Sequence, residues 1–176
     1  MSAREQKNTK RWATRQKNLR SKDPNVRASA RAIGTKNDNN GVHVGFGDLL
    51  RQGIKGSVDP SNHGMGLTVD IQVRVDSSLS GKSLQETIAH EGTHVADDSN
   101  FLTSYDFIAG KYNSATNPTS GETEFRAFQA GAGVDREHGF GPHDTYKILD
   151  FLEHHPHYGP VRELLVFDPN DPNYPQ

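Results

Sequence analysis

Three features of the sequence predict an α+β fold in which a small sheet packs against helices. Residues 67–75 alternate between apolar and polar side chains, which is typical of a half-buried strand. Two later segments begin with helix-capping patterns and continue with helical spacing. The chain has 176 residues, of which 32% are hydrophobic, so it can build one main core and has little room for a second.

Two strands are predicted from the pattern of apolar residues. In residues 67–75 one face of the sheet would be apolar, and its members are Leu67, Val69, Ile71, Val73 and Val75. A shorter strand is expected at residues 42–46. The residues that follow it, as far as Gly66, are rich in Gly, Pro, Asn and Ser and are expected to form a loop.

Three helices are predicted from capping patterns and spacing. Ser83 and Glu86 form a capping box at the start of the first helix, and Thr119 and Glu122 form another at the start of the second. Glycines near residue 131 are expected to end the second helix. The expected spans are 83–98, 121–131 and 144–154, and Pro160 can open a short last helix.

The charges of the chain are distributed unevenly. Residues 1–36 contain 11 of the 20 Lys and Arg residues but only 2 of the 22 Asp and Glu residues, so this segment carries +9 and the remainder −11. A basic segment can bind nucleic acid, but the only aromatic residue here is Trp12, and packing on the acidic remainder is the simpler interpretation. The expected organisation is a basic arm or linker at 1–41, a folded domain at 42–167 and a disordered tail at 168–176.

Composition excludes several classes of protein. The chain has no cysteine, which rules out disulfide scaffolds, cysteine nucleophiles and thiolate zinc sites, so a metal would be held by His and carboxylate. The mean hydropathy is −0.80, and no segment approaches the roughly 20 apolar residues of a membrane span. No apolar stretch follows the basic N-terminus, so no signal peptide is expected.

Residues 90–94 carry the pattern HExxH. On a helix, His90 and His94 lie on one face about one turn apart, so both imidazoles can reach a single cation. Zinc bound by two His and one carboxylate keeps a fourth position for water, and Glu91 is placed to take a proton from that water. The pattern therefore predicts a zinc site with the chemistry of a hydrolase.

A carboxylate is expected as the third zinc ligand. The metzincin continuation of HExxH requires Gly at position 97 and His or Asp at position 100, whereas this chain has Asp97 and Asn100. The second predicted helix offers Glu122 and Glu124, and Glu122 already has a capping role. Glu124 is therefore the predicted ligand, with Glu122, Asp97 and Asp98 as its competitors.

The stretch HEGTHVADD at 90–98, followed by Glu124-Phe125-Arg126-Ala127, resembles the gluzincin type of zinc metallopeptidase. The resemblance covers about 45 residues and implies that His90, His94 and Glu124 bind zinc. It also implies that Glu91 is the general base of peptide hydrolysis, on a zincin-like fold with a small twisted sheet packed on the HExxH helix. The protein or peptide substrate would then lie in a cleft beside the metal.

Two features depart from the gluzincin pattern. The spacing from His94 to Glu124 is 30 residues, which is longer than in thermolysin. Phe128 stands where thermolysin has a carboxylate four residues after its ligand glutamate. We therefore expect Asp97 or Asp98 to orient an imidazole instead.

The small size, the basic arm, the absence of a signal peptide and the ETEFRAF segment resemble the compact HExxH toxin domains of bacterial polymorphic toxins and type VI secretion spike proteins. This resemblance implies a metallopeptidase effector that is made in the cytoplasm of the producing cell. A specialised secretion apparatus would deliver it into another cell, where it would cleave a protein. A cognate immunity protein is then an expected partner.

Zinc-dependent hydrolysis also needs a donor that stabilises the developing oxyanion. His143, in the turn before the third helix, is the first candidate, and the others are His138, Tyr105, Tyr112 and Tyr146. The strand at 67–75 precedes the HExxH helix, where zincins usually have an edge strand beside the active-site cleft, so the resemblance implies that a peptide substrate could pair with this strand.

Two other functions fit parts of the sequence. A nucleic-acid-binding module would act through the basic arm and use the metal structurally, although structural zinc sites close all four positions and often use thiolates. A zinc amidase would act on a non-protein amide such as peptidoglycan, although HExxH is not the usual signature of that chemistry.

Overall fold

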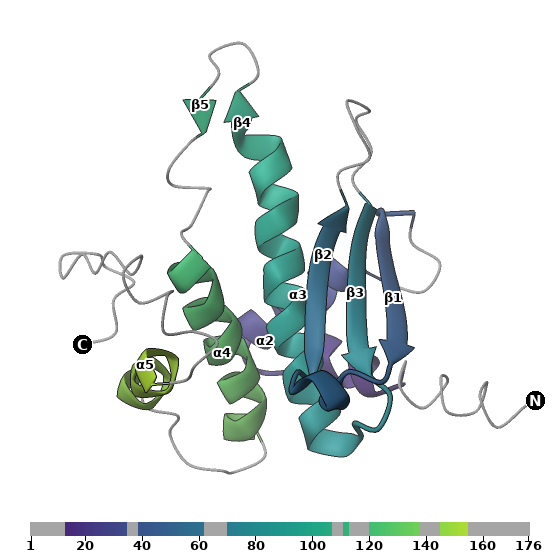
Figure 1. Cartoon of the computed structure of the whole chain (residues 1–176), viewed down its shortest axis with the longest axis vertical. Helices are drawn as coiled ribbons and strands as arrows, with labels where there is room; N and C mark the ends of the chain where they lie inside the picture. The colour runs from purple at the N-terminus through teal and green to yellow at the C-terminus, as the bar shows by residue number, and fades with distance from the viewer. Residues whose placement is uncertain are drawn as a thin grey trace, which may run out of the picture.

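The computed structural model describes residues 13–34, 39–61, 70–106, 111–112, 120–137 and 145–154. Residues 13–19 are helical, and a 3-10 turn spans Leu50–Gln52. The chain is α+β, as predicted, with the sheet on one side of α3 and with α4 and α5 on the other (Figure 1). In chain order, the elements are α2 (Pro24–Ile33), β1 (Val42–Gly47), β2 (Gly56–Ser61), β3 (Asp70–Asp76), α3 (Gly81–Ser104), β4 (Tyr105–Asp106), β5 (Lys111–Tyr112), α4 (Ser120–Glu137) and α5 (Thr145–His154).

The main sheet has three strands in the order β1-β3-β2. β1 runs parallel to β3, with Val44 opposite Val73, and β2 runs antiparallel to β3, with Val58 opposite the same residue. The strand predicted at 67–75 is confirmed over its described part, but the expectation that it lies at the edge of the sheet is wrong. β2 occupies that edge and falls in the segment expected to be a loop, because its sequence GSVDPS has a single apolar residue in Val58 and no visible alternation.

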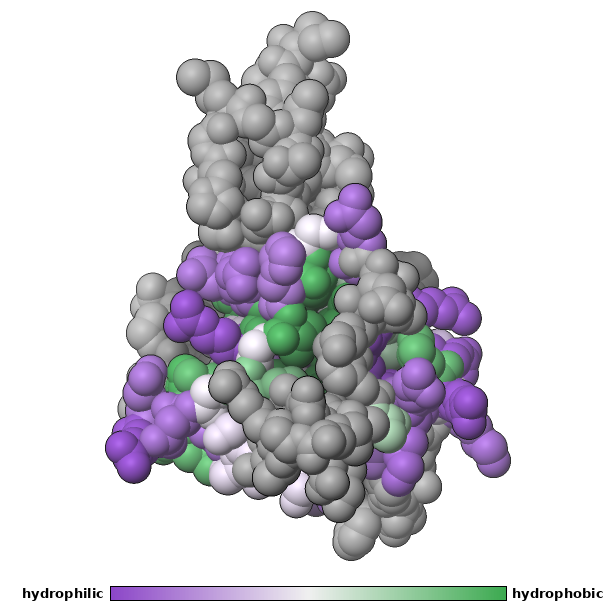
Figure 2. Space-filling model, turned by 90° about the vertical axis from the view of Figure 1, so that its right-hand side faces the viewer, coloured by the Kyte–Doolittle hydropathy of each residue, from purple (hydrophilic) through white to green (hydrophobic). Residues whose placement is uncertain are grey.

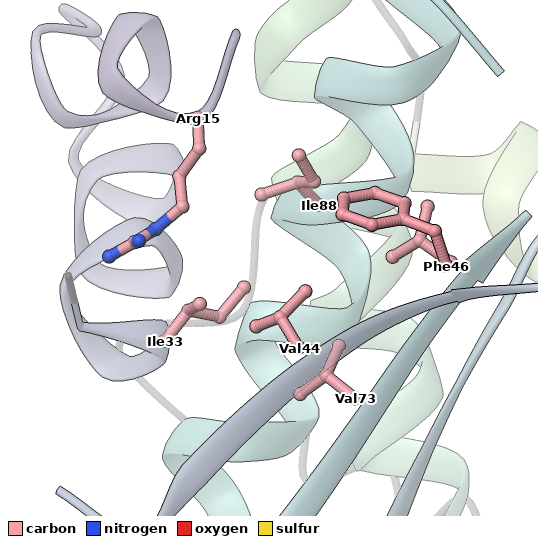
Figure 3. A pocket seen from close by; sticks show the side chains of 7 residues that line it. Arg15, Ile33, Val44, Phe46, Val73 and Ile88 are labelled. Carbon is pink, nitrogen blue, oxygen red and sulfur yellow. The ribbon is translucent and has the colours of Figure 1, made fainter. Parts of the chain in front are cut away.

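The core forms where β3 packs on α3. Alternate residues of β3, Ile71, Val73 and Val75, are at most 3% exposed and pack with residues of two helices, namely Ile33, Leu84, Ile88 and Val95. A hollow of about 10 Å³ remains between Arg15, Ile33, the sheet and Ile88 (Figure 3), which leaves this core nearly filled. Seen from the β1 side, hydrophobic residues gather near the middle of the face, with hydrophilic residues on both sides of them (Figure 2).

The folded part of the chain extends well before Val42, so the expected boundary of the arm at residue 41 is wrong. Asp23 caps α2 by accepting hydrogen bonds from the backbone N–H groups of Asn25 and Val26, at 2.9 and 3.3 Å. Val26 and Ala30 are fully buried, and Val26 packs with residues of α3 and α4. The segment was predicted to be an arm because of its high positive charge, although one face of this helix carries a short apolar stripe.

Glycines allow α2 to approach the two helices of the predicted site. A Cβ atom on Gly92 would lie 2.8 Å from the carbonyl carbon of Ser29, and one on Gly133 would lie 2.7 Å from the carboxylate of Asp23. The hydroxyls of Ser29 and Thr93 are 2.8 Å apart and share a hydrogen bond. Gly92 and Thr93, the two residues between Glu91 and His94 in the HExxH pattern, are therefore part of the surface on which α2 packs.

The helices differ in length from the prediction. α3 begins at Gly81 and continues to Ser104, so Ser83 lies inside the first turn and is not the cap. α4 continues through Gly131 to Glu137, because packing of its glycine-rich part against α2 stabilises the helix where propensity would end it. α5 agrees with the predicted span. Pro160 and the predicted tail lie outside the described residues.

Asp76, at the end of β3, organises the connection from β1 to β2. Its Oδ2 accepts hydrogen bonds from the backbone N–H groups of Leu49 and Leu50, at 2.6 and 2.8 Å, and its Oδ1 accepts from Ser78. The Ser78 hydroxyl, together with these N–H groups, holds the pKa of Asp76 well below its usual range. The N–H of Asp76 also donates to the carbonyl of Lys55 at 2.8 Å, which fixes the start of β2.

Candidate metal centre

Three predicted ligands converge between α3 and α4. His90 and His94 come from α3 and Glu124 from α4, and one ligand atom of each lies within 4.8 Å of the others. The two Nε2 atoms are 3.2 Å apart, and each lies 3.5 Å from a different oxygen of Glu124. Ligand atoms around a tetrahedral zinc, at bond lengths of about 2.0–2.2 Å, are separated by about 3.3–3.6 Å. The donor set and its spacing therefore fit zinc.

A buried oxygen of Glu124 provides a second test of this fit. Oε2 has no hydrogen-bond partner among the described residues, although it faces Nε2 of His90. A buried carboxylate oxygen without a hydrogen bond is costly unless a cation or a proton satisfies it. Oε2 lies 3.5 Å from Nε2 of His90, within the group of candidate ligand atoms, so a metal bound there would satisfy it.

The packing of α3 on α4 explains why the ligands meet. His90 and His94 are four residues apart on α3 and therefore share one face of the helix. On α4, Ala127 is fully buried, and its small side chain lets the helices approach each other three residues beyond Glu124. The ligand side chains are 15–22% exposed, so the site remains open to solvent on one side.

Glu91 lies beside this cluster in a nearly dry environment. It is 5% exposed, and burial raises its pKa to about 7, with a smaller lowering by His90 and a further raising by Glu124. Burial lowers the pKa of His94 to about 4, so its ring is neutral at neutral pH, as a metal ligand requires. Burial alone would raise the pKa of Glu124, but its contacts with His90 and His94 outweigh burial and lower it.

Aromatic packing surrounds His90. The ring of Phe128 meets the imidazole edge to face, with centroids 4.7 Å apart, and the ring of Phe151 makes a second edge-to-face contact with Phe128, with centroids 5.2 Å apart. Phe151 is 42% exposed, so the row of rings runs from the ligand to the surface. Phe128 stands where a carboxylate would orient the imidazole, and here packing restricts the ring of His90.

An ion pair links α3 and α4 next to the ligands. Arg126 donates to Oδ1 of Asp97 at 2.7 Å, and the Asp97 side chain is only 11% exposed. The structure thus gives Asp97, which was expected to orient an imidazole, a role in joining the two ligand-bearing helices. The side chain of Asp98 lies outside the described residues.

Several predicted residues cannot be compared with the structure. His143 and His138 lie outside the described residues, as do the side chains of Glu122, Tyr105, Tyr112 and Tyr146. Arg126 and Gly56 were not predicted from the sequence to have a role at the site. Gly56 lies on β2, against Glu91, and the only local signal for it was a glycine in a segment that resembled a loop.

The raised pKa of Glu91 predicts a pH-dependent difference between the metal-free wild type and Glu91→Gln. Between about pH 4.5 and pH 7 the folded state keeps a proton on Glu91 that the unfolded state has released. The contribution of Glu91 to the free energy of unfolding is therefore fully present below pH 4.5 and is lost as the pH rises through 7. Gln has no such loss. Relative to wild type, Glu91→Gln should therefore gain up to about 3 kcal/mol between pH 4.5 and pH 8.

Urea unfolding of both chelator-treated proteins at the two pH values measures this difference. The lowered pKa of His94 acts in the opposite direction but is common to both proteins, so it cancels in the comparison. A stability difference that does not change with pH would show that Glu91 titrates normally.

Comparison of the chain with protein-family models, with curated proteins and with solved structures finds no match. Among the described residues, no helix has the length and apolar character needed to cross a membrane.

Proposed function

We propose that this chain is a zinc-dependent metallopeptidase with a zincin-like arrangement of its site. The observation that carries the proposal is the convergence of His90, His94 and Glu124 at separations that suit tetrahedral zinc. A buried glutamate, Glu91, directly follows His90 in α3. This combination suits hydrolysis better than a structural metal site, because the three ligands found among the described residues leave one coordination position open.

Glu91 supplies the proton transfer in this proposal. Zinc bound at the site would polarise a peptide carbonyl and lower the pKa of a coordinated water to about 7. A general base works best when its pKa lies near the operating pH, and burial brings Glu91 into that range. Glu91 would accept the proton of the water and pass it to the leaving amine, without a covalent intermediate.

The edge of β2 that faces away from β3, which pairs with no other described strand, is the proposed support for an extended substrate, in place of the strand at 67–75. The bond from the N–H of Asp76 to the carbonyl of Lys55 sets the hydrogen-bonding alternation along β2. Counted from Lys55, the N–H and C=O groups of Gly56 and Val58 then point away from β3. These groups lie on the strand that passes Glu91 and could pair with a peptide backbone.

The biological setting rests on the sequence resemblance alone. We propose an effector that a specialised secretion apparatus delivers and that an immunity protein neutralises in the producing cell. The substrate would be a protein of the recipient cell.

The decisive experiment measures zinc content and proteolysis together. The purified chain is stripped with a chelator and reloaded with one equivalent of zinc, and its metal content is measured by elemental mass spectrometry. It is then incubated with a bacterial lysate, and newly formed protein N-termini are labelled and sequenced by mass spectrometry. We expect one zinc per chain, and new N-termini that disappear with chelator and return with zinc.

The other outcomes would overturn the proposal in distinct ways. A chain that retains no zinc has no metal centre. A zinc-loaded chain that cleaves purified peptidoglycan but no protein is an amidase. A chain that holds no zinc but binds DNA, with an affinity that falls steeply as the salt concentration rises, is a nucleic-acid-binding module that acts through its basic segment.

A further inference from the structure

We infer that Gly56, on the edge strand β2, is a positioning residue for Glu91. Because residue 56 has no side chain, the side chain of Glu91 has room to lie between α3 and β2. The inference rests on the proposed role of Glu91 as the general base. It adds that a residue on another element, 35 positions earlier in the chain, sets the position of the Glu91 side chain.

The contact involves more of Glu91 than its carboxylate. A Cβ atom on Gly56 would lie 2.8 Å from both Cγ and Cδ of Glu91, and nearer still to Oε1. Rotation of the carboxylate alone could not clear such an atom, because Cγ precedes the last rotatable bond. Relief of the contact at Cγ would require rotation about the Cα–Cβ bond of Glu91. That rotation would carry the carboxylate away from its present place.

β2 has little freedom to move away from Glu91. Gly56 pairs with Val75 in the centre of the sheet, and the preceding residue, Lys55, is bonded to the N–H of Asp76 at 2.8 Å. Asp76 also holds the connection before β2 through Leu49 and Leu50. An added methyl group would therefore displace Glu91 more readily than the strand.

The need for glycine at position 56 arises from space and not from backbone conformation. Four described glycines have positive φ, and Gly56 is not among them: they are Gly34, Gly41, Gly53 and Gly81. Alanine can therefore adopt the backbone of residue 56 without strain. Gly47 on β1 is a matched control, because it is also a strand glycine without positive φ, and a Cβ atom there would meet nothing within 4 Å.

The test combines Gly56→Ala and Gly47→Ala with changes at Glu91. In the wild-type background, Gly56→Ala should keep one zinc per chain and leave KM within about twofold, while kcat on a peptide containing a cleavage site found in the lysate falls by about 100-fold. Gly47→Ala should behave like wild type. A fall in zinc content that accompanies the fall in kcat, or equal effects of the two alanines, would overturn the inference.

Thermal unfolding of the metal-free proteins tests the contact without any activity. Gly56→Ala should lower Tm by about 3–8 °C in the wild-type and Glu91→Gln backgrounds, because Gln has the same shape as Glu. In the Glu91→Ala background the loss should nearly vanish, because Ala lacks Cγ, Cδ and the carboxylate. The same Tm loss in all three backgrounds would show that Gly56 does not act on residue 91. If the wild type cleaves nothing but this coupling is found, the proposed function fails and the contact stands.

Discussion

Replacement of Glu91 by Gln is expected to lower kcat by about 10³-fold while one zinc per chain remains bound. Gln fills the same buried space between α3 and β2 but cannot accept a proton, so the change removes the base and leaves the ligands in place. The measurement pairs kcat, on a peptide that the wild type cleaves, with zinc content by elemental mass spectrometry.

Glu86→Gln is the matched control for this prediction. Glu86 lies on the same helix, one turn and a half before Glu91, and pairs with Lys82 at 3.3 Å on a partly exposed face. Its kcat should stay within about twofold of wild type, because an exposed ion pair contributes at most about 1 kcal/mol to stability and does not reach the ligands. Full activity of Glu91→Gln would assign the proton transfer to another group.

Replacement of Glu124 by Ala is expected to weaken zinc binding by more than about 100-fold. Loss of a residue that only supports a ligand typically costs about 10–100-fold, and here a direct ligand is removed from between two imidazoles. Competition with a chromogenic chelator measures the zinc affinity. The apo protein should remain folded, since Glu124 is partly exposed and the core residues of α4 are unchanged.

The competing ligands supply the controls for Glu124. Asp97→Ala removes the ion pair with Arg126 but no atom of the His90, His94 and Glu124 cluster, so zinc affinity should fall by less than about 10-fold. Glu122→Ala should leave zinc affinity unchanged. If Glu122→Ala lost zinc and Glu124→Ala kept it, the ligand assignment would be wrong.

Much of the candidate site was predictable because its signals are local. The spacing of His90 and His94 sets both rings on one face of any helix that contains them. The choice of Glu124 over Glu122 followed from a helix-capping argument; the structure places the side chain of Glu124 with the two imidazoles, and the side chain of Glu122 lies outside the described residues. The alternation that ends in Ile71, Val73 and Val75 predicted the buried face of β3 for the same reason, since a strand repeats every two residues.

The surroundings of the site were not predictable in the same way. The sequence predicted a basic arm where the structure has α2, because this segment is rich in Lys and Arg and has few apolar residues. Those apolar residues pack against α3 and α4, which the small size of Gly92 and Gly133 allows. β2 appeared to be a loop, because Gly56 and Pro60 interrupt any local pattern. Its place at the edge depends on pairing with β3 and on the hydrogen bonds of Asp76.

The HExxH helix, the strand β3 and the α+β class could therefore be predicted from the sequence, since each depends on the period of a single helix or strand. The strand that lies beside Glu91, the full lengths of α3 and α4, and the place of α2 in the fold were visible only in the three-dimensional structure. These features depend on contacts between residues far apart in the chain. Such contacts stabilise a segment whose own propensity is weak, so no local pattern records them.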